Sequence, residues 1–288
     1  MEAKDLIKKV RKIEIKTKKL SNNLFGGEYH SAFKGRGMTF SEVRGYEFGD
    51  DVRSIDWNVT ARYNQPFVKV FEEERELTLM LIVDISGSKF FGTNSQLKKD
   101  IVTEISATLA FSAIQNNDKV GLILFSDEVE LYISPSKGKT HILRIIRELI
   151  EFKPKSSKTD ISVALKFFSN IVRKKSIAFI ISDFDSPEYS KALSFTSKKH
   201  DITGIRIFDR FDDEIPNIGF IPMIDQESLQ VKYVDTESKN VRAEYQAKSL
   251  LRKNEFEKLF KKNGAGIISC RTDESYVKLL LRYFKNRV

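Results

Sequence analysis

The sequence predicts an α/β protein built on a doubly wound, mostly parallel sheet, with an N-terminal helix and a β-rich appendage before it. Residues 77–88 and 176–183 are nearly unbroken apolar runs that each contain or reach an aspartate, and helical patterns alternate with further apolar runs along the chain. Apolar runs without a period of two are typical of strands buried on both faces of a parallel sheet. Because strands and helices alternate, we expect helices on both faces of that sheet. The main domain is expected at residues 76–288 and the appendage at residues 1–75.

The appendage begins with a basic segment. Residues 1–20 hold eight basic and three acidic residues, and their apolar positions fall on one helical face. We expect a helix that packs on its own domain. A helix lying on a membrane surface, giving peripheral membrane contact, stays open as the alternative. Residues 22–49 are rich in glycine and aromatic residues, which predicts strands and turns.

A densely charged block surrounds the only tryptophan, Trp57. Its charges alternate in sign, which favours a structural ion-pair network over a carboxylate cluster for catalysis. We expect Arg53 or Arg62 to pair with a neighbouring aspartate, and Trp57 to pack against the α/β core. The aspartates of this block are Asp50, Asp51 and Asp56.

The main domain follows with regular alternation. After the first strand, periodicity predicts helices and strands in the order that a doubly wound sheet requires, interrupted by a small β excursion at about residues 209–236. The expected elements are a helix at 97–115, a strand at 119–126 with a hairpin partner at 129–133, helices at 140–152 and 161–173, the strand at 176–183, a short helix at 187–199, a strand at 202–208, excursion strands at 218–224 and 228–234, a basic helix at 239–262, a strand at 266–270 and a closing helix at 274–287.

The candidate functional residues follow the first buried strand. Asp84, Ser86 and Ser88 place one carboxylate and two hydroxyls within a single turn. These are hard oxygen donors, which suit Mg²⁺ better than a softer metal. In open α/β sheets, ligands bind outside the carboxyl ends of the strands, where Asp84 is expected to lie.

Two further segments complete a known pattern. Asp183 ends the second apolar run, and Thr159 precedes a helical segment. The order Asp-x-Ser-x-Ser, then Thr, then Asp after a hydrophobic strand resembles the metal-ion-dependent adhesion site of von Willebrand factor A domains. The resemblance implies Mg²⁺, or another divalent cation, held by Asp84, Ser86, Ser88, Thr159 and Asp183. As the alternative, Ser86 and Ser88 form a turn and Thr159 caps a helix, without a metal.

A longer signature lies upstream of the first strand. Gly49-Asp50-Asp51-x-Arg53-x-Ile55-Asp56-Trp57, followed by Thr60-Ala61-Arg62, resembles the signature of a bacterial family of unknown function. Its members are typically encoded beside MoxR-type AAA+ ATPases and are described with a von Willebrand A-like domain. Two features depart from the family: Lys89 stands where a Met is common, and we expect no counterpart of the membrane-spanning N-terminal region that many relatives have. The resemblance implies that the protein partner is a MoxR-type ATPase or its client.

Composition limits the other function classes. Lys and Arg number 49 against 40 Asp and Glu, a net charge of +9, but the lysines are spread along helices without an interleaved aromatic platform, so nucleic acid is disfavoured as a partner. Cys270 is the only cysteine, which fits a reducing compartment and predicts a buried, small apolar side chain. No run is long enough to cross a bilayer. We expect a cytoplasmic protein.

Binding explains the candidate residues better than catalysis does. Phosphoryl transfer usually surrounds its metal with several carboxylates, whereas this loop offers one, and His30, His141 and His200 lie on separate predicted elements. Two carboxylates with three hydroxyls leave a divalent cation electrophilic, so that it can accept a carboxylate from another protein. We therefore expect a Mg²⁺-dependent interaction module and not an enzyme. A Mg²⁺-dependent, phosphatase-like hydrolase with Asp84 as its nucleophile is the alternative.

Overall fold

A computed structural model describes residues 39–72, 77–87, 98–224 and 231–287. The chain divides into two compact units, of which one spans residues 33–77 and the other contains every described residue from Thr78 onward. The predicted helix at 1–20 lies outside the described residues, and so does most of the glycine-rich stretch at 22–49.

The smaller unit is a two-stranded antiparallel sheet with a short helix. Strands β1 (Thr39–Gly45) and β2 (Phe67–Glu72) pair with each other, and the 3-10 turn η1 (Val52–Ser54) and helix α3 (Trp57–Tyr63) lie between them in the chain. Helix α3 begins where the Asp56 carboxylate accepts hydrogen bonds from two backbone N–H groups of the first turn, and it ends at Asn64 in the left-handed conformation.

The ion pairs of this unit differ from the predicted ones. The Asp50 carboxylate accepts two hydrogen bonds from Arg44, at 2.7 and 2.8 Å, and the bond to this guanidinium holds the pKa of Asp50 below its ordinary value. Asp56 pairs with Lys69 at 3.5 Å. The prediction that Arg53 or Arg62 supplies the cation is therefore wrong, because the hairpin brings residues of β1 and β2 to the aspartates. Trp57 is 67% exposed, so its ring is not packed within this unit.

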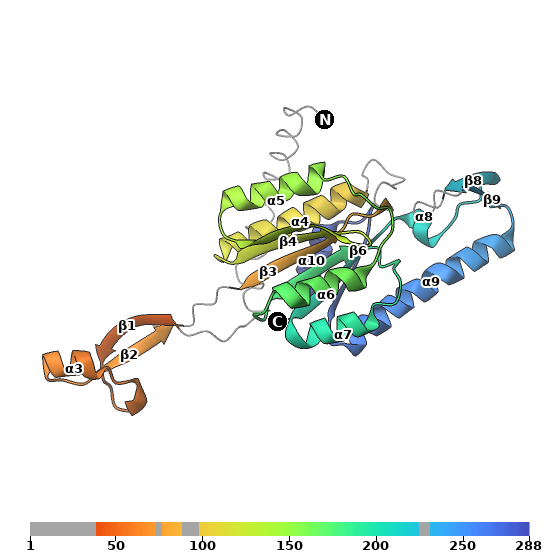
Figure 1. Ribbon diagram of the computed structural model, residues 1–288. Coiled ribbons are helices and arrows are strands. Elements are labelled where there is room, and N and C mark those ends of the chain that lie inside the picture. Colours follow the sequence, from red (N-terminus) through yellow and green to blue (C-terminus); the bar gives the residue numbers. More distant parts are fainter. Residues whose placement is uncertain (1–38, 73–76, 88–97, 225–230, 288) are drawn as a thin grey trace. The chain divides into compact units, whose positions relative to one another are not determined.

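The larger unit is built on a six-stranded sheet in the order β10-β7-β6-β3-β4-β5 (Figure 1). All neighbours pair in parallel except β4 and β5, which form an antiparallel pair. Because the apolar runs occupy the central strands, nearly every residue of β3 and β6 is buried. The predicted doubly wound, mostly parallel sheet is confirmed. The strands are β3 (Thr78–Asp84), β4 (Lys119–Phe125), β5 (Val129–Ser136), β6 (Ile177–Ser182), β7 (Asp201–Phe208) and β10 (Gly266–Arg271).

Helices cover both faces of this sheet (Figure 1). Helices α6 (Ile161–Ile171), α7 (Ser190–Lys199) and α9 (Lys239–Lys262) bury their apolar sides in one cluster with alternate residues of the strands. Gly204 permits the close approach of α9, because a Cβ at this position would lie 2.5 Å from the ring of Phe260. The opposite face carries α4 (Lys98–Gln115), α5 (Lys139–Glu151) and α10 (Tyr276–Lys285), the last through contact of Phe284 with Phe179.

The β excursion contains one element that periodicity missed. Its strands β8 (Phe220–Ile224) and β9 (Val231–Asp235) form an antiparallel hairpin at the predicted place. The four-residue helix α8 (Arg210–Asp213) precedes them. This helix is too short to show a period and forms because Asp209 and Asp212 cap it reciprocally.

Two remaining expectations concern burial and membranes. Cys270 is 1% exposed, as predicted, and burial raises the pKa of its thiol to about 12. Within the described ranges, no helix combines the length and the apolar character that crossing a membrane demands.

Candidate metal centre at the sheet edge

The candidate residues lie where the strand order of the sheet reverses. From β3 the chain adds β4 and β5 on one side, and from β6 it adds β7 and β10 on the other. Such a reversal opens a crevice at the carboxyl ends of the two central strands, where α/β proteins bind ligands. Val83 pairs with Ile181, so Asp84 and Asp183 lie at the same edge of the sheet.

Asp84 is the most enclosed of the candidate residues. Its side chain is fully buried, with 0% exposure. One carboxylate oxygen accepts a hydrogen bond from the backbone N–H of Ser86, at 2.9 Å, and the other accepts from the Ser182 hydroxyl, at 2.6 Å. A buried carboxylate is costly unless it is hydrogen bonded or paired with a cation. Both of these donors are neutral groups.

The hydroxyl of Ser86 is buried as well. Ser86 is 0% exposed, and its Oγ atom has no hydrogen-bond partner among the described residues. A buried polar atom without a partner costs about 1–3 kcal/mol, so each case in a folded protein calls for an explanation. One such explanation is that Ser86 Oγ is a ligand of a cation. Ser88 lies outside the described residues.

Three loops are joined by hydrogen bonds around these residues. The N–H of Gly87 donates to the carbonyl of Ser157, at 3.2 Å, which links the first loop to the loop before α6. The N–H of Ile161 donates to Ser186 Oγ, at 3.1 Å, which links that second loop to the loop after β6. Thr159 lies in the second loop and is 5% exposed.

The residue that caps the helix after Thr159 is the next one in the chain, and the helix itself begins at Ile161. Asp160 is the N-cap of α6, and its carboxylate accepts from the backbone N–H of Ser162, at 2.8 Å. The Asp160 N–H in turn donates to the carbonyl of Ser126 at the end of β4. Thr159 is therefore not the helix cap. The alternative explanation of this threonine, as a cap in a protein without a metal, does not hold.

Asp183 is held by an unusual turn. Phe184 follows it with a φ of 63°, a conformation that costs a bulky side chain on the order of 1–3 kcal/mol. Packing offsets this strain, because the Phe184 ring lies 4.3 Å from Phe256 and 5.3 Å from Phe260 between ring centres. Its N–H also donates to Ser182 Oγ, at 3.1 Å. Asp183 keeps accessible surface, unlike Asp84 and Ser86.

The described residues fit a small, hard cation. All candidate donors are oxygens, the buried Ser86 hydroxyl has no partner among the described residues, and the two hydrogen-bond donors to Asp84 are neutral. A cavity of about 20 Å³ beside Asp84 is lined by residues of α4 and α5, among them Lys99 and Leu149, and by none of the other candidate ligands, so it is not part of this centre. Asp84, Ser86 and Thr159 would supply the buried ligands and Asp183 the ligand nearest to solvent.

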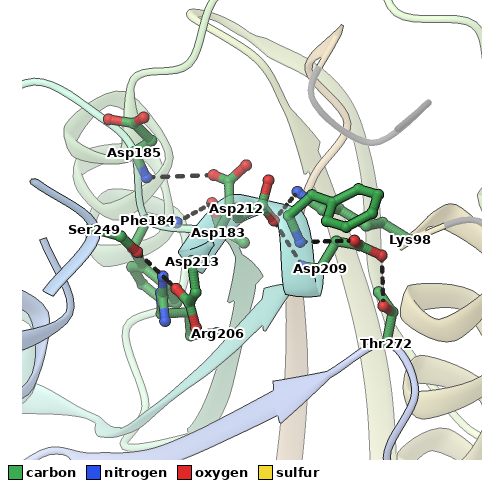
Figure 2. Close-up of polar contacts among 12 residues, drawn as sticks. Lys98, Asp183, Phe184, Asp185, Arg206, Asp209, Asp212, Asp213, Ser249 and Thr272 are labelled. Carbon is green, nitrogen blue, oxygen red and sulfur yellow. Dashed lines mark hydrogen bonds and ion pairs between the residues drawn. The ribbon is translucent and has the colours of Figure 1, made fainter. Parts of the chain in front are cut away.

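A second acidic cluster on the same edge carries its own cations (Figure 2). Asp212 pairs with Lys98 at 2.6 Å, although the lysine side chain is only 5% exposed. Asp213 accepts from Ser249 Oγ at 2.6 Å and lies 3.6 Å from Arg206. This cluster therefore binds helices α4, α8 and α9 to the sheet and needs no external ion.

The remaining acidic groups near this cluster are also bonded. Asp209 is fully buried and accepts from Thr272 Oγ1, at 2.8 Å, and from the N–H of Phe211, at 3.0 Å. Asp185, in the loop after β6, pairs with Arg252 of α9. In the part of the chain that the structure describes, no three Asp, Glu, His or Cys side chains converge as a metal cage.

Sequence reasoning missed Ser182 and Phe184. Ser182 joins Asp84 to the loop of Asp183, and its signal in the sequence is a hydroxyl at the last position of an otherwise apolar strand. The strain at Phe184 leaves no such signal, because nothing about a phenylalanine predicts a left-handed backbone.

Fold and site together define a doubly wound α/β protein with a carboxylate and hydroxyl site at the strand-order reversal. Residues 42–255 match the family described as "Protein of unknown function DUF58", and the chain belongs to that family. The uncharacterized protein Rv1480 of Mycobacterium tuberculosis is 26% identical over 281 residues, which cover 96% of this chain and 88% of the relative.

Solved structures provide more distant likenesses. An aerotolerance-related membrane protein from Bacteroides fragilis matches 73% of this chain and 99% of its own with 16% identity and a TM-score of 0.49. The VWA domain of SpRpn10 matches 74% of this chain and 96% of its own with 10% identity and a TM-score of 0.40. These likenesses are too distant to transfer a function.

Proposed function

We propose that this protein is a cytoplasmic, Mg²⁺-dependent protein-interaction module that binds a carboxylate of a partner protein. The cation is held by Asp84, Ser86, Ser88, Thr159 and Asp183. One observation carries the proposal: Asp84 and Ser86 are buried side by side, yet the carboxylate has only neutral hydrogen-bond donors and the hydroxyl has no partner among the described residues. A divalent cation would satisfy both groups.

The residues of this chain prepare the site before any cation binds. The Ser86 N–H and the Ser182 hydroxyl orient the two carboxylate oxygens of Asp84. The turn at Phe184 fixes Asp183 at the edge of the sheet, where it retains contact with solvent. When bound, Mg²⁺ supplies an electrophilic position that a carboxylate oxygen of a partner can occupy.

The partner class comes from the sequence resemblance. We propose a MoxR-type AAA+ ATPase or its client as the protein that supplies the carboxylate, with this chain acting as an adaptor. The cytoplasmic placement rests on the single cysteine, which suits a reducing compartment.

Two measurements test the proposal together. Isothermal titration calorimetry with MgCl₂ is expected to show saturable binding, which Ser86→Ala weakens and Ser106→Ala leaves unchanged. Ser106 is a matched control, since its hydroxyl is also buried and unpaired among the described residues but lies within α4. Binding of the purified ATPase is then expected with MgCl₂ and not with EDTA. Equal binding in both buffers would contradict the proposed mechanism.

The hydrolase alternative gains no support from the geometry of Asp84. Its carboxylate is buried, and both of its oxygens already accept hydrogen bonds, whereas a nucleophile must approach a substrate atom. Assay of the protein with a generic phosphomonoester is expected to give no turnover above buffer with or without MgCl₂. Mg²⁺-dependent release of phosphate that Asp84→Asn abolishes would establish the alternative.

A further inference from the structure

The hairpin of β8 and β9 exposes an apolar face. Residues of alternate positions point to one side of the pair, and on this side Phe220 is 69% exposed, Ile224 55%, Val231 52% and Tyr233 67%. The rings of Phe220 and Tyr233 stack with centres 5.8 Å apart and 11° between their planes. We call these four residues the hairpin face. Figure 1 shows the hairpin beside the first residues of α9.

Such a face is unusual for a surface without a partner. Two-stranded sheets are marginally stable alone in water and usually pack against another element. Contiguous exposed apolar patches commonly mark an interaction site, whereas single exposed apolar residues need no explanation. The hairpin face therefore calls for an occupant.

The charge around the hairpin restricts that occupant. The described residues of the hairpin and of the segment that follows it, 220–224 and 231–237, contain the acidic residues Asp235 and Glu237 and the basic residue Lys232, in a chain whose net charge is +9. Both carboxylates are exposed, and Asp235 lies opposite Phe220 in the register of the hairpin. Exposed carboxylates beside an apolar centre fit a surface with an apolar centre and basic groups near it, because complementary charge favours encounter.

The outer side of α9 has those properties. Its inner side is identified by Ser249, which bonds to Asp213, and by the buried rings of Phe256 and Phe260. Leu250 and Leu251 lie about 100° and 200° around the helix from Ser249. They are 55% and 60% exposed.

Basic residues surround these two leucines. Helix α9 contains eight basic and three acidic residues. On its exposed side near the leucines lie Lys258 and Lys248, of which Lys248 also pairs with Glu244 at 2.7 Å. We call this surface, centred on Leu250 and Leu251, the helix face. The hairpin face does not cover the helix face within one chain, because the residues of both faces are exposed.

We propose that the hairpin face of one copy of this protein binds the helix face of a second copy, and that two copies form a symmetric dimer. In a two-fold dimer a contact of residue i with residue j occurs twice, so both faces of both copies are covered. The basic residues near the helix face then meet Asp235 and Glu237 of the other copy. This dimer uses no residue of the candidate metal centre and does not depend on the proposed function.

Sedimentation velocity over a range of protein concentrations tests the proposal. The full chain is expected to be dimeric at about 100 µM, where an interface with a Kd of about 10 µM is largely formed. The paired substitutions Phe220→Ser with Tyr233→Ser, and separately Leu250→Ser with Leu251→Ser, are each expected to raise the dissociation constant at least tenfold. Phe195→Ser is the matched control, since Phe195 lies on α7 and is 64% exposed. It is expected to leave the dimer intact.

Mixing the two variants distinguishes this contact from other ways to cover the hairpin. One variant keeps its helix face and the other its hairpin face, so a mixed pair retains one intact contact and is expected to recover part of the dimer. A monomeric wild type at about 100 µM would overturn the proposal. So would a helix-face variant that dimerises normally, which indicates contact of hairpin with hairpin, or a mixture that stays monomeric.

Two further readouts complete the experiment. The melting temperature of each variant, measured by circular dichroism, is expected to match that of the wild type, because all four substituted side chains are exposed. If the variants that lose the dimer are also the ones that unfold, the loss does not support the interface and counts against it. Dimerisation is also expected to be the same with MgCl₂ and with EDTA. If the protein dimerises but does not bind the ATPase, the proposed function is contradicted and the dimer is not.

Discussion

Two acidic clusters occupy the same edge of the sheet, and their buried carboxylates are stabilised in different ways. Asp84, at the end of β3, is buried among neutral donors, the Ser86 N–H and the Ser182 hydroxyl. Asp212, which follows β7, is paired with the buried ammonium group of Lys98. Both sites are built from loops at the carboxyl ends of parallel strands, so their backbone setting is similar and their counter-charges differ.

The difference indicates which cluster is open to an ion. A carboxylate that already has an internal cation gains little from a second one, whereas a buried carboxylate with neutral donors still favours positive charge nearby. The positions of the cations determine the outcome: Lys98 begins α4 and pairs with Asp212, and Arg206, on β7, lies 3.6 Å from Asp213. The second cluster thus joins helices to the sheet, and the first keeps the features that the proposed cation site requires.

The largest expected effect comes from the scaffold that both clusters share. Leu81 lies in the middle of β3 and is 0% exposed. Leu81→Ala is expected to lower the free energy of unfolding by about 2–5 kcal/mol, because it leaves a cavity in the core. Urea denaturation followed by circular dichroism measures this loss. An effect below about 1 kcal/mol would show that β3 is not the centre of the sheet.

The next effect tests the second cluster. Lys98→Met keeps much of the side-chain volume and removes the cation, so it is expected to cost about 1–3 kcal/mol through the unpaired Asp212 carboxylate. Lys261→Met is the control. Lys261 forms an exposed pair with Glu257 on α9, and its loss is expected to cost about 0.5 kcal/mol or less. Equal losses in the two variants would contradict the assignment of Lys98 to a structural role.

Mg²⁺ is expected to act on the first cluster with a smaller effect. At about tenfold excess over its dissociation constant, a ligand that binds only the folded protein adds about 1.4 kcal/mol to the free energy of unfolding. Thermal melts in MgCl₂ and in EDTA measure this increment. The increment is expected to persist in Lys98→Met, since the second cluster supplies none of the proposed ligands. Its disappearance in that variant would mean that the two clusters are not separate.

The smallest effect on stability is expected for Ser86→Ala. Without Mg²⁺, removing a buried hydroxyl that has no partner is expected to change the free energy of unfolding by less than about 1 kcal/mol, and a small gain is in keeping with its burial. With Mg²⁺, the variant is expected to lose most of the metal-dependent increment, whereas Ser106→Ala retains it. Comparison of melts for both variants in the two buffers provides the measurement. A full increment in Ser86→Ala would remove this hydroxyl from the ligand set.

The sequence by itself determined the parts of this protein that depend on local pattern. The length and apolar character of residues 77–84 and 176–182 predicted two buried parallel strands, and the aspartates that end these runs were expected at one edge of the sheet. Both features are local, because burial on two faces requires an unbroken apolar run and parallel strands end on the same side. The positions of Asp84 and Asp183 follow from this rule alone.

Only the tertiary structure decided which groups meet across the chain. The sequence offers Arg53 and Arg62 near the aspartates around Trp57, but the β1–β2 hairpin brings Arg44 and Lys69 to them instead. The bond of Ser182 to Asp84, the pairing of Lys98 with Asp212 and the exposure of the hairpin face likewise depend on how distant segments pack. Periodicity reports which side of an element is buried, and it carries no information on which of many similar polar groups lies opposite, because that choice is made by the path of the backbone in three dimensions.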